Sequence, residues 1–468
     1  MPLTATATSF TQTHFLTMKR PVKAGLPLFS VEERPPGVTP PISTESRPTV
    51  IVPQIPESIA ATGLSASSIE QLVLKLLLFH SGISGSELAA AAGLSSNLID
   101  SLLDSLLQAQ LVQVWSSFGI GKASATFSLT DTGRLHAADY LKINQYMGPA
   151  PVPLDQYNRI VQSQRRRTGW LTPKMLAEAC AGMVITPETL AQAGPAVSAG
   201  KSLLIHGLPG NGKTHLAEAL AELDPSPIFL PYAIECQGII IQVFDPKYHQ
   251  VTEPASFGEF DARWFKCRRP FVVSGSELSP EMLELSFNET SKVYDAPLQL
   301  KASNGIYFID DFGLQRTPPA EVLNRLMVPM ERGFDHFTFQ TGQRMAAPVD
   351  ALLLLSTNLR PESLGGEAFL RRIQYKMLIR NPKREEFLEI FLSFCKSLEL
   401  SADQGLAARF IERHYWRTGR PFRRCHPRDV ISHAIDMIHF EGLPYELTDE
   451  LLDRAFESCF VSDEEKEL

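Results

Sequence analysis

The spacing of apolar and polar residues divides the chain into a polar N-terminal stretch and two regions with regular periodicity. Residues 1–64 are rich in Pro, Thr and Ser and show little apolar periodicity, which is typical of a disordered tail. Residues 65–142 contain three stretches with the apolar period of helices, then an alternating stretch around a glycine-containing turn, then a closing helical stretch. We therefore predict three helices, a β-hairpin and a final helix over this range.

The rest of the chain has the pattern of an α/β domain. Residues 143–172 predict a linker into this second body. From residue 173 onward, buried strands alternate with helices, which favours a parallel sheet with flanking helices over 173–380. Residues 381–468 are mainly helical in pattern. We predict an α/β core with insertions and a C-terminal α-helical lid.

Composition excludes several classes of protein. The 468 residues are 44% hydrophobic and carry a formal net charge of −8, so the whole chain has no general attraction for nucleic acid or anionic membranes. No apolar run approaches the length of a membrane span, and the N-terminus lacks the apolar segment of a signal peptide. The six cysteines are scattered without a C-x-x-C pair, which fits a reducing cytoplasm better than a disulfide or zinc framework.

A glycine-rich turn follows the apolar strand Leu203–Ile205. It has the spacing G-x-x-x-x-G-K-T from Gly207 to Thr214. Glycines let backbone N–H groups turn inward around an anion, and the following helix presents its positive dipole end. A turn without a ligand is the alternative, but the strand before it, the helix after it and the full spacing favour a phosphate site. The residues expected to bind the nucleotide are Gly207, Leu208, Pro209, Gly210, Asn211, Gly212, Lys213, Thr214 and His215.

Two further apolar strands end in polar side chains. The stretch "NGIYFIDDFG" ends in Asp310 and Asp311, and "PVDALLLLSTN" ends in Asn358. A carboxylate at a strand end beside the glycine-rich loop can hold Mg²⁺ together with Thr214, and a second acid can polarise an attacking water. Solvated turn residues are the alternative. We predict Asp310 as a metal ligand, Asp311 as a catalytic acid and Asn358 as a group that orients water.

Three arginines are further candidates for the catalytic site. Arg371 and Arg372 lie in "AFLRRI", and Arg428 stands at the head of a predicted helix. Each is a weak signal alone, because arginines before a helix usually form a solvated face. The order of all these features along the chain makes them specific.

Residues from about 150 to 460 resemble an AAA+ ATPase module. The Walker A motif corresponds to Gly207–Thr214, Walker B to Ile306–Asp311, sensor 1 to Asn358 and sensor 2 to Arg428. The resemblance implies binding and hydrolysis of ATP with Mg²⁺ in a homo-oligomeric ring, most often a hexamer. It also implies that an arginine reaches the neighbouring subunit's nucleotide, and we favour Arg372 over Arg371 for this role.

Two features of the sequence bear on which AAA+ subgroup it resembles and how fast it hydrolyses ATP. The second Walker B acid is usually Glu, and here it is Asp311, whose shorter reach can slow hydrolysis. Extra strand-like stretches precede Walker B, and "GFDHFTFQTGQRMAAPVD" predicts a hairpin before sensor 1, as in the group with a helix-2 insert and a pre-sensor-1 hairpin. The arrangement is also similar, more loosely, to bacterial ATPases described as having chaperone activity.

The elements predicted over 65–142 resemble a winged-helix domain, a fold that usually reads DNA. A DNA-reading helix needs Lys or Arg, yet residues 95–110 contain neither, and residues 65–142 hold four Lys/Arg against six Asp/Glu. Protein docking or assembly is therefore favoured over DNA binding. Basic clusters lie elsewhere, at Arg165–Arg167 and among six lid arginines, where solvated or subunit-contact roles compete with nucleic-acid binding.

The sequence leads to one main hypothesis and two rivals. The main one is an ATP-hydrolysing AAA+ remodelling or chaperone-type motor that acts on an unidentified protein client. The first rival is a DNA-handling AAA+ ATPase of the helicase-loader or transposition-helper type. The second is a nucleotide-dependent scaffold that barely hydrolyses ATP, which the Asp at position 311 keeps open.

Overall fold

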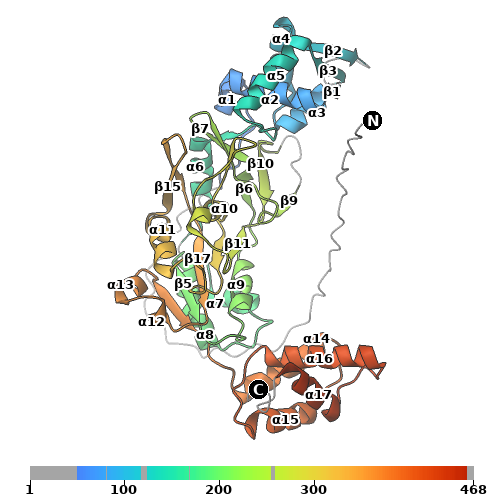
Figure 1. The fold of residues 1–468 in the computed structure, drawn as a ribbon, viewed down its shortest axis with the longest axis vertical. Helices are drawn as coiled ribbons and strands as arrows, with labels where there is room; N and C mark the ends of the chain where they lie inside the picture. Colours follow the sequence, from blue (N-terminus) through green and yellow to red (C-terminus); the bar gives the residue numbers. More distant parts are fainter. Residues whose placement is uncertain (1–49, 81, 118–123, 168, 254–258, 461–468) are drawn as a thin grey trace, which may run out of the picture. The chain divides into compact units, whose positions relative to one another are not determined.

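The computed structural model describes residues 50–80, 82–117, 124–167, 169–253 and 259–460 (Figure 1). All of them belong to one compact unit, Pro48–Leu468. Residues 1–49 of the predicted disordered tail lie outside the described residues. Residues 50–64 do not behave as a disordered tail: they contain α1 (Ile59–Thr62), and the Thr62 carbonyl accepts a hydrogen bond from the buried Arg263 guanidinium at 2.9 Å. The prediction of disorder up to residue 64 was therefore wrong for this part, because local composition does not reveal a distant arginine.

The elements predicted from the periodicity between residues 65 and 142 are present. Polar N-caps begin three of the helices, at Ser65, Ser84 and Thr130, and each side chain accepts a hydrogen bond from the first turn. A three-stranded antiparallel sheet of order β1-β3-β2 closes the group. The elements are α2 (Ala66–Phe79), β1 (Ile83–Ser84), α3 (Gly85–Ala92), α4 (Ser96–Gln108), β2 (Val112–Ser117), β3 (Ala125–Leu129) and α5 (Asp131–Ile143).

Five parallel strands form the central sheet of the core. Their order is β11-β14-β17-β5-β18, so the strand before the glycine-rich loop lies between two later strands. Helices flank the sheet (Figure 1). The strands are β5 (Leu203–His206), β11 (Phe271–Ser274), β14 (Ile306–Ile309), β17 (Leu352–Thr357) and β18 (Tyr375–Leu378), and the helices are α7 (Pro173–Ala179), α8 (Pro187–Ser198), α9 (Lys213–Ala221), α10 (Leu298–Lys301), α11 (Pro319–Arg332), α12 (Pro361–Leu364) and α13 (Glu367–Leu370).

Both faces of this sheet are covered by apolar side chains. Along β5, Leu203 and Ile205 belong to the apolar cluster that includes α8 and α9 residues, while Leu204 belongs to the cluster that includes α11 residues. The same alternation occurs along β14 and β17. Because successive side chains of a strand point to opposite faces, a strand covered on both sides is apolar over most of its length; here the polar residues of β5 and β17, His206, Ser356 and Thr357, lie at the carboxyl ends. The predicted α/β fold class, a parallel sheet with flanking helices followed by a helical C-terminal region, is confirmed.

The insertions of the core build a second, mainly β layer with its own apolar cluster. The predicted hairpin before sensor 1 is present as β15 (Phe334–Thr338) and β16 (Arg344–Pro348). The predicted linker was partly wrong, because α6 (Leu154–Ser163) packs Tyr157, Ile160 and Val161 into this cluster. The other elements are β4 (Val152–Pro153), β6 (Ile228–Pro231), β7 (Ala233–Cys236), β8 (Ile239–Gln242), β9 (Val251–Glu253), β10 (Trp264–Cys267), a 3₁₀ turn (Pro280–Leu283), β12 (Ser286–Asn288) and β13 (Val293–Asp295).

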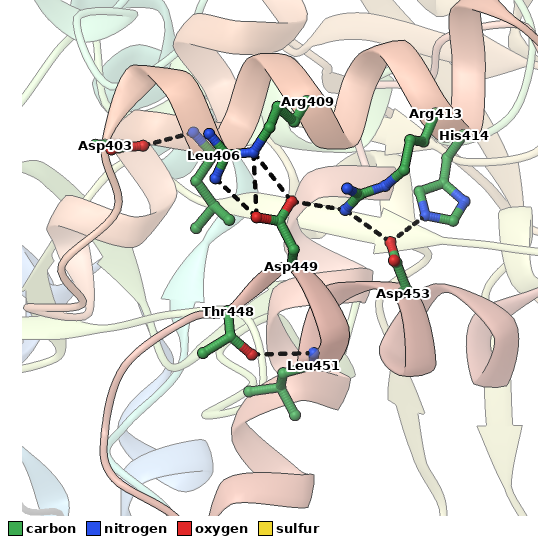
Figure 2. A network of polar contacts seen from close by, with 9 residues as sticks. All are labelled: Asp403, Leu406, Arg409, Arg413, His414, Thr448, Asp449, Leu451 and Asp453. Carbon is green, nitrogen blue, oxygen red and sulfur yellow. Dashed lines mark hydrogen bonds and ion pairs between the residues drawn. The ribbon is translucent and has the colours of Figure 1, made fainter.

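The C-terminal region is helical, as predicted, and comprises α14 (Arg384–Ser397), α15 (Gln404–Ile411), a π-helical turn (Glu412–Trp416), α16 (His426–Glu441) and α17 (Asp449–Cys459). An ion-pair network joins α15 to α17 (Figure 2). Asp449 accepts from Arg409 and Arg413 at 2.7 Å each, and Asp453 accepts from Arg413 at 3.0 Å. Among the described residues, no helix has the length and apolar character needed to cross a membrane.

Lys75 is unusual among the residues of the N-terminal helical group, which spans residues 65–142. It is a lysine on α2 with only 3% of its surface exposed. Its Nζ donates to Asn144 Oδ1 at 2.7 Å and to the Asn144 carbonyl at 3.3 Å. Burial lowers the pKa of Lys75 to about 8. The charged form is therefore costly in the folded state.

We predict that Lys75→Met raises the thermal stability at pH 7 by about 1–2 kcal/mol, because it removes a buried charge. The pKa of Lys75 is lower in the folded than in the unfolded chain, so the folded wild type sheds its proton first as pH rises above about 8. The advantage of Met should therefore shrink between about pH 8 and 10. Thermal unfolding at pH 7 and pH 9.5 measures both effects, with the exposed Lys142→Met as control. A less stable Lys75→Met protein at pH 7 would contradict the prediction.

Candidate phosphate and metal site

The glycine-rich loop joins β5 to α9 in a conformation that requires glycine at its ends. Gly207 has φ +148°, and a Cβ there would lie 2.3 Å from the carbonyl oxygen of Ile379. Gly212 has φ +83° and is the N-cap of α9. The first N–H groups of α9 are thus presented at the end of the loop, where they and the helix dipole favour an anion.

Lys213, the first residue of α9, connects the loop to the end of β17. Its Nζ donates to the carbonyls of Gly207 and Leu208 at 2.9 and 3.1 Å, and to Asn358 Oδ1 at 2.6 Å. Burial lowers the pKa of Lys213, the two nearby aspartates oppose this, and the Arg423 guanidinium lowers it further. Lys213 is therefore close enough to Asp310, Asp311 and Arg423 for the charge of each to affect its pKa.

Thr214 and Asp310 form the pair expected at a magnesium site. Thr214 Oγ1 donates to Asp310 Oδ2 at 2.9 Å, and Ser356 Oγ donates to the other carboxylate oxygen of Asp310. A hydroxyl and a carboxylate oxygen side by side are the hard ligands that Mg²⁺ takes from a protein when phosphates and waters supply the rest. The described residues contain no group of three or more His, Cys, Asp or Glu that could hold a metal alone. The residues therefore fit Mg²⁺ bound jointly with a phosphate ligand.

Asp311 and Asn358 meet beside this pair. Asn358 Nδ2 donates to Asp311 Oδ1 at 2.7 Å, while the oxygen of the same amide accepts from Lys213. Asp311 has φ +50°, the left-handed region that Asp tolerates better than most residues, and its N–H donates to Ser356 Oγ at 3.2 Å. One amide thus links Lys213 of the glycine-rich loop to the predicted catalytic acid.

The remaining predicted residues are placed differently. The side chains of Leu208 and Pro209 are exposed, and His215 lies 3.4 Å from Glu218 on the outer face of α9. Only the backbone of these three residues can serve the loop. Asn211 directs its side chain to residues outside the loop, described below.

The structure does not bring the three predicted arginines to the loop. Arg371 pairs with Glu367 on its own helix at 2.6 Å, and Arg372 donates to Asn324 on α11. Arg428 is exposed and pairs with the adjacent Asp429 at 2.9 Å. A role for Arg371 or Arg372 requires another subunit, and a role for Arg428 requires a change in its side-chain position.

Two residues of the site were missed from the sequence. Ser356 bonds both Asp310 and the Asp311 backbone, and Arg423 faces the loop where Arg428 was expected. Ser356 lies two residues before Asn358 in an otherwise apolar strand, so the polar residue itself was a usable signal. Arg423 carried no distinguishing signal among the neighbouring arginines.

Comparison with known proteins adds little beyond the architecture. Residues 383–458 match a family model described as "Domain of unknown function (DUF8689)". No curated protein matches the sequence. NtrX from Brucella abortus, solved in complex with ATP, is 16% identical with a TM-score of 0.37 over 72% of this chain and 66% of that one, slightly less than two thirds of its length.

The RuvB Holliday junction branch migration motor of Thermotoga maritima is 15% identical with a TM-score of 0.34, over 59% of this chain and 69% of that one. Likenesses this distant carry no information about substrate or partner. The function must follow from the residues of the site itself.

We predict that Lys213→Ala weakens binding of a fluorescent ATP analogue by at least about 100-fold. The variant removes the charge that faces the phosphates, and charge-assisted hydrogen bonds contribute roughly 1.5–3 kcal/mol each. Lys201→Ala, an exposed lysine just before β5, is the matched control and should bind normally. Equal affinity in the Lys213→Ala protein would show that the loop is not the binding site.

Proposed function

We propose that this chain is an AAA+ ATPase that hydrolyses ATP with Mg²⁺ and uses the energy to remodel a protein client. One observation carries the proposal: the ends of three adjacent parallel strands place Thr214 beside Asp310, and place Asn358 between Lys213 and Asp311. A loop for phosphates, a site for Mg²⁺ and an oriented acid are the parts that phosphoryl transfer to water requires.

Each residue has a distinct part in the proposed reaction. The loop N–H groups and Lys213 bind the phosphates, and Thr214 and Asp310 hold Mg²⁺, which would neutralise charge on the triphosphate. Asp311 accepts a hydrogen bond from the attacking water and polarises it, while Asn358 orients the acid and the water. In the present structure Asn358 bonds Lys213 and Asp311 together, so bound phosphate would compete for Lys213 and release the amide.

We further propose that the active form is a homo-oligomeric ring, with six subunits as the expected number. Among the described residues, the predicted arginines bond Glu367, Asn324 and Asp429 rather than residues of the loop, so we infer that the arginine finger comes from a neighbouring subunit. Arg372 donates to the neutral Asn324 rather than to a carboxylate, which leaves its charge available for such a role. Arg371 is already paired with Glu367, which keeps Arg372 the better candidate.

The partners of the basic side chains support a protein client over DNA. Arg165 lies 3.3 Å from Asp350, and Arg166 bonds Asp224 at 2.9 Å and stacks on Trp170. Most arginines of the C-terminal region also have partners. Carboxylates pair with Arg409, Arg413, Arg417 and Arg424, and Arg420 stacks on aromatic rings. These arginines hold the fold together rather than form a free basic surface.

Among the described residues of 65–142, helix α4 carries no Lys or Arg. On α4 the leucines and the isoleucine point inward, and the exposed positions are hydroxyl, amide and acidic side chains such as Ser101 and Asp104. Leucines do not line this exposed face, because Leu98, Leu102 and Leu103 complete the local core. We propose that this winged-helix-like group docks protein or other copies of the chain. The six free cysteines fit the proposed cytoplasmic location.

The catalytic proposal is tested with Asp311→Asn, which should bind ATP normally but hydrolyse it at least about 100-fold more slowly, because an amide cannot accept a proton from water. Asp310→Asn should instead raise the Mg²⁺ concentration needed for half-maximal activity. Fluorescent ATP titration and phosphate release measure the two properties separately. Normal turnover by Asp311→Asn would move the catalytic role to another acid, and negligible turnover by the wild type would favour the scaffold hypothesis.

The same phosphate-release measurement tests whether each active site is shared between two subunits of a ring. Arg372→Ala should lose about 10³-fold or more of the rate, and mixing it with Asp311→Asn protein should restore part of the activity where intact faces meet. Arg371→Ala is the matched control. Activity that stays constant on dilution of a monomeric protein would exclude a shared site.

The choice of client is tested with DNA. We predict that the full-length protein shows no micromolar binding to duplex or single-stranded DNA at about 50 mM salt, with or without ATP, because most arginines in the two basic clusters that the structure describes already have acidic or aromatic partners and few are left to release counterions. Fluorescence anisotropy across a salt series measures this. Micromolar binding that weakens steeply with added salt would establish the DNA-handling alternative.

A further inference from the structure

Asn211 occupies the fifth position of the glycine-rich loop, where the motif leaves the residue type free. Its side chain is buried, with 1% of the residue exposed. Nδ2 donates to Asn381 Oδ1 at 2.8 Å, and Oδ1 lies 3.5 Å from the backbone nitrogen of Arg424. The amide is therefore engaged with residues at and beyond the end of the core rather than with the phosphate position.

Asn381 lies in the short connection between β18, which ends at Leu378, and α14, which begins at Arg384. Its Oδ1 also accepts a hydrogen bond from Arg423. A carboxamide oxygen has two lone pairs, so these two donors satisfy it. Asn211, Asn381 and Arg423 thus join the loop, the connection and the segment before α16, and we refer to these three residues as the clasp.

The backbone of the loop is held from the same side. The Cys425 N–H donates to the Gly210 carbonyl at 2.9 Å. Gly210 has φ +76°, and a Cβ there would lie 2.5 Å from Cys425 Sγ, so the close approach depends on glycine. Arg424 anchors this segment through Glu386 on α14 at 3.0 Å.

The planarity of the peptide gives these contacts a consequence for phosphate binding. The Gly210 carbonyl and the Asn211 N–H belong to one trans peptide, so they point in opposite directions. When Cys425 holds the carbonyl toward the C-terminal region, the Asn211 N–H is turned the other way. The clasp fixes the Asn211 side chain on the side of the carbonyl and prevents the peptide from rotating.

We propose that Asn211 is a positioning residue: through the clasp it orients the peptide between residues 210 and 211 for phosphate and couples nucleotide occupancy to the position of the C-terminal helices. This inference rests on the proposed nucleotide site. Coupling between two events is reciprocal, so the helices tighten nucleotide binding by the same factor by which nucleotide holds the helices. The side chain of Asn211 therefore acts through the loop rather than as a phosphate ligand.

Two variants of Asn381 separate hydrogen bonding from simple packing. Asn381→Leu has a similar size but no acceptor, whereas Asn381→Asp keeps an acceptor for both Asn211 and Arg423. In full-length protein without nucleotide, Asn381→Leu should speed hydrogen exchange of peptides covering residues 423–426 at least about tenfold. It should also weaken ATP binding about 3–10-fold, the effect of one or two lost hydrogen bonds. Asn381→Asp should stay within about twofold of wild type in exchange.

Asn211→Ala should change exchange and affinity in the same direction as Asn381→Leu, and the two effects should be less than additive in the double variant, because both substitutions remove the hydrogen bond between Asn211 and Asn381. A slowly hydrolysed ATP analogue should protect residues 423–426 in wild type and much less in these variants. Asn97→Leu, an exposed position on α4, is the control for general destabilisation.

Three results would overturn the inference. Equal behaviour of Asn381→Leu and Asn381→Asp would leave only a packing role. Wild-type exchange and wild-type affinity in both Asn211→Ala and Asn381→Leu would exclude the coupling. A wild-type chain that binds no nucleotide would overturn the proposed function and the coupling with it, while the nucleotide-free exchange would still report whether the clasp holds the segment.

Discussion

The pairing of β17 with β5 on one side and with β14 on the other is the constraint on which the site depends. The register places Thr357 opposite His206 and Leu355 opposite Ile309, so the three strands end at nearly the same level. The residues that follow these strand ends are then forced together. A single-residue slip in either pairing would exchange the side chains that pack on the two covered faces of the sheet as well as separate the polar ends, so packing protects the geometry of the site.

This arrangement explains why the chemistry lies at the carboxyl edge of the sheet. In open α/β sheets ligands bind in the crevice beyond those strand ends, where loops leave in different directions. Here the segment before α16 also lies against the glycine-rich loop, where the backbone nitrogens of Arg424 and Cys425 contact Asn211 and Gly210. The C-terminal helices pack around an apolar cluster of their own, and ion pairs such as Asp449 with Arg409 and Arg413 lie at its surface.

Much of the fold could be predicted because its signals are local. Strands that are apolar throughout, helices with polar caps and a loop of fixed spacing are all visible within about twenty residues. The site was predictable to the same extent: Lys213, Thr214, Asp310, Asp311 and Asn358 follow strand ends and do meet. What could not be predicted depends on contacts between distant segments, such as Thr62 with Arg263, the packing of α6 into the β layer, and the approach of Arg423 rather than Arg428 to the loop.

The left-handed backbone at Asp311 bears on the geometry of the acid that follows β14. Asp is among the residues found most often at positive φ, so the +50° at this position is tolerated there. The Asp311 N–H donates to Ser356 Oγ on β17, and the Asp311 carboxylate accepts from Asn358, which follows the same strand. Backbone and side chain of this one residue are therefore both held by β17, which limits how far the carboxylate can move from the end of the sheet.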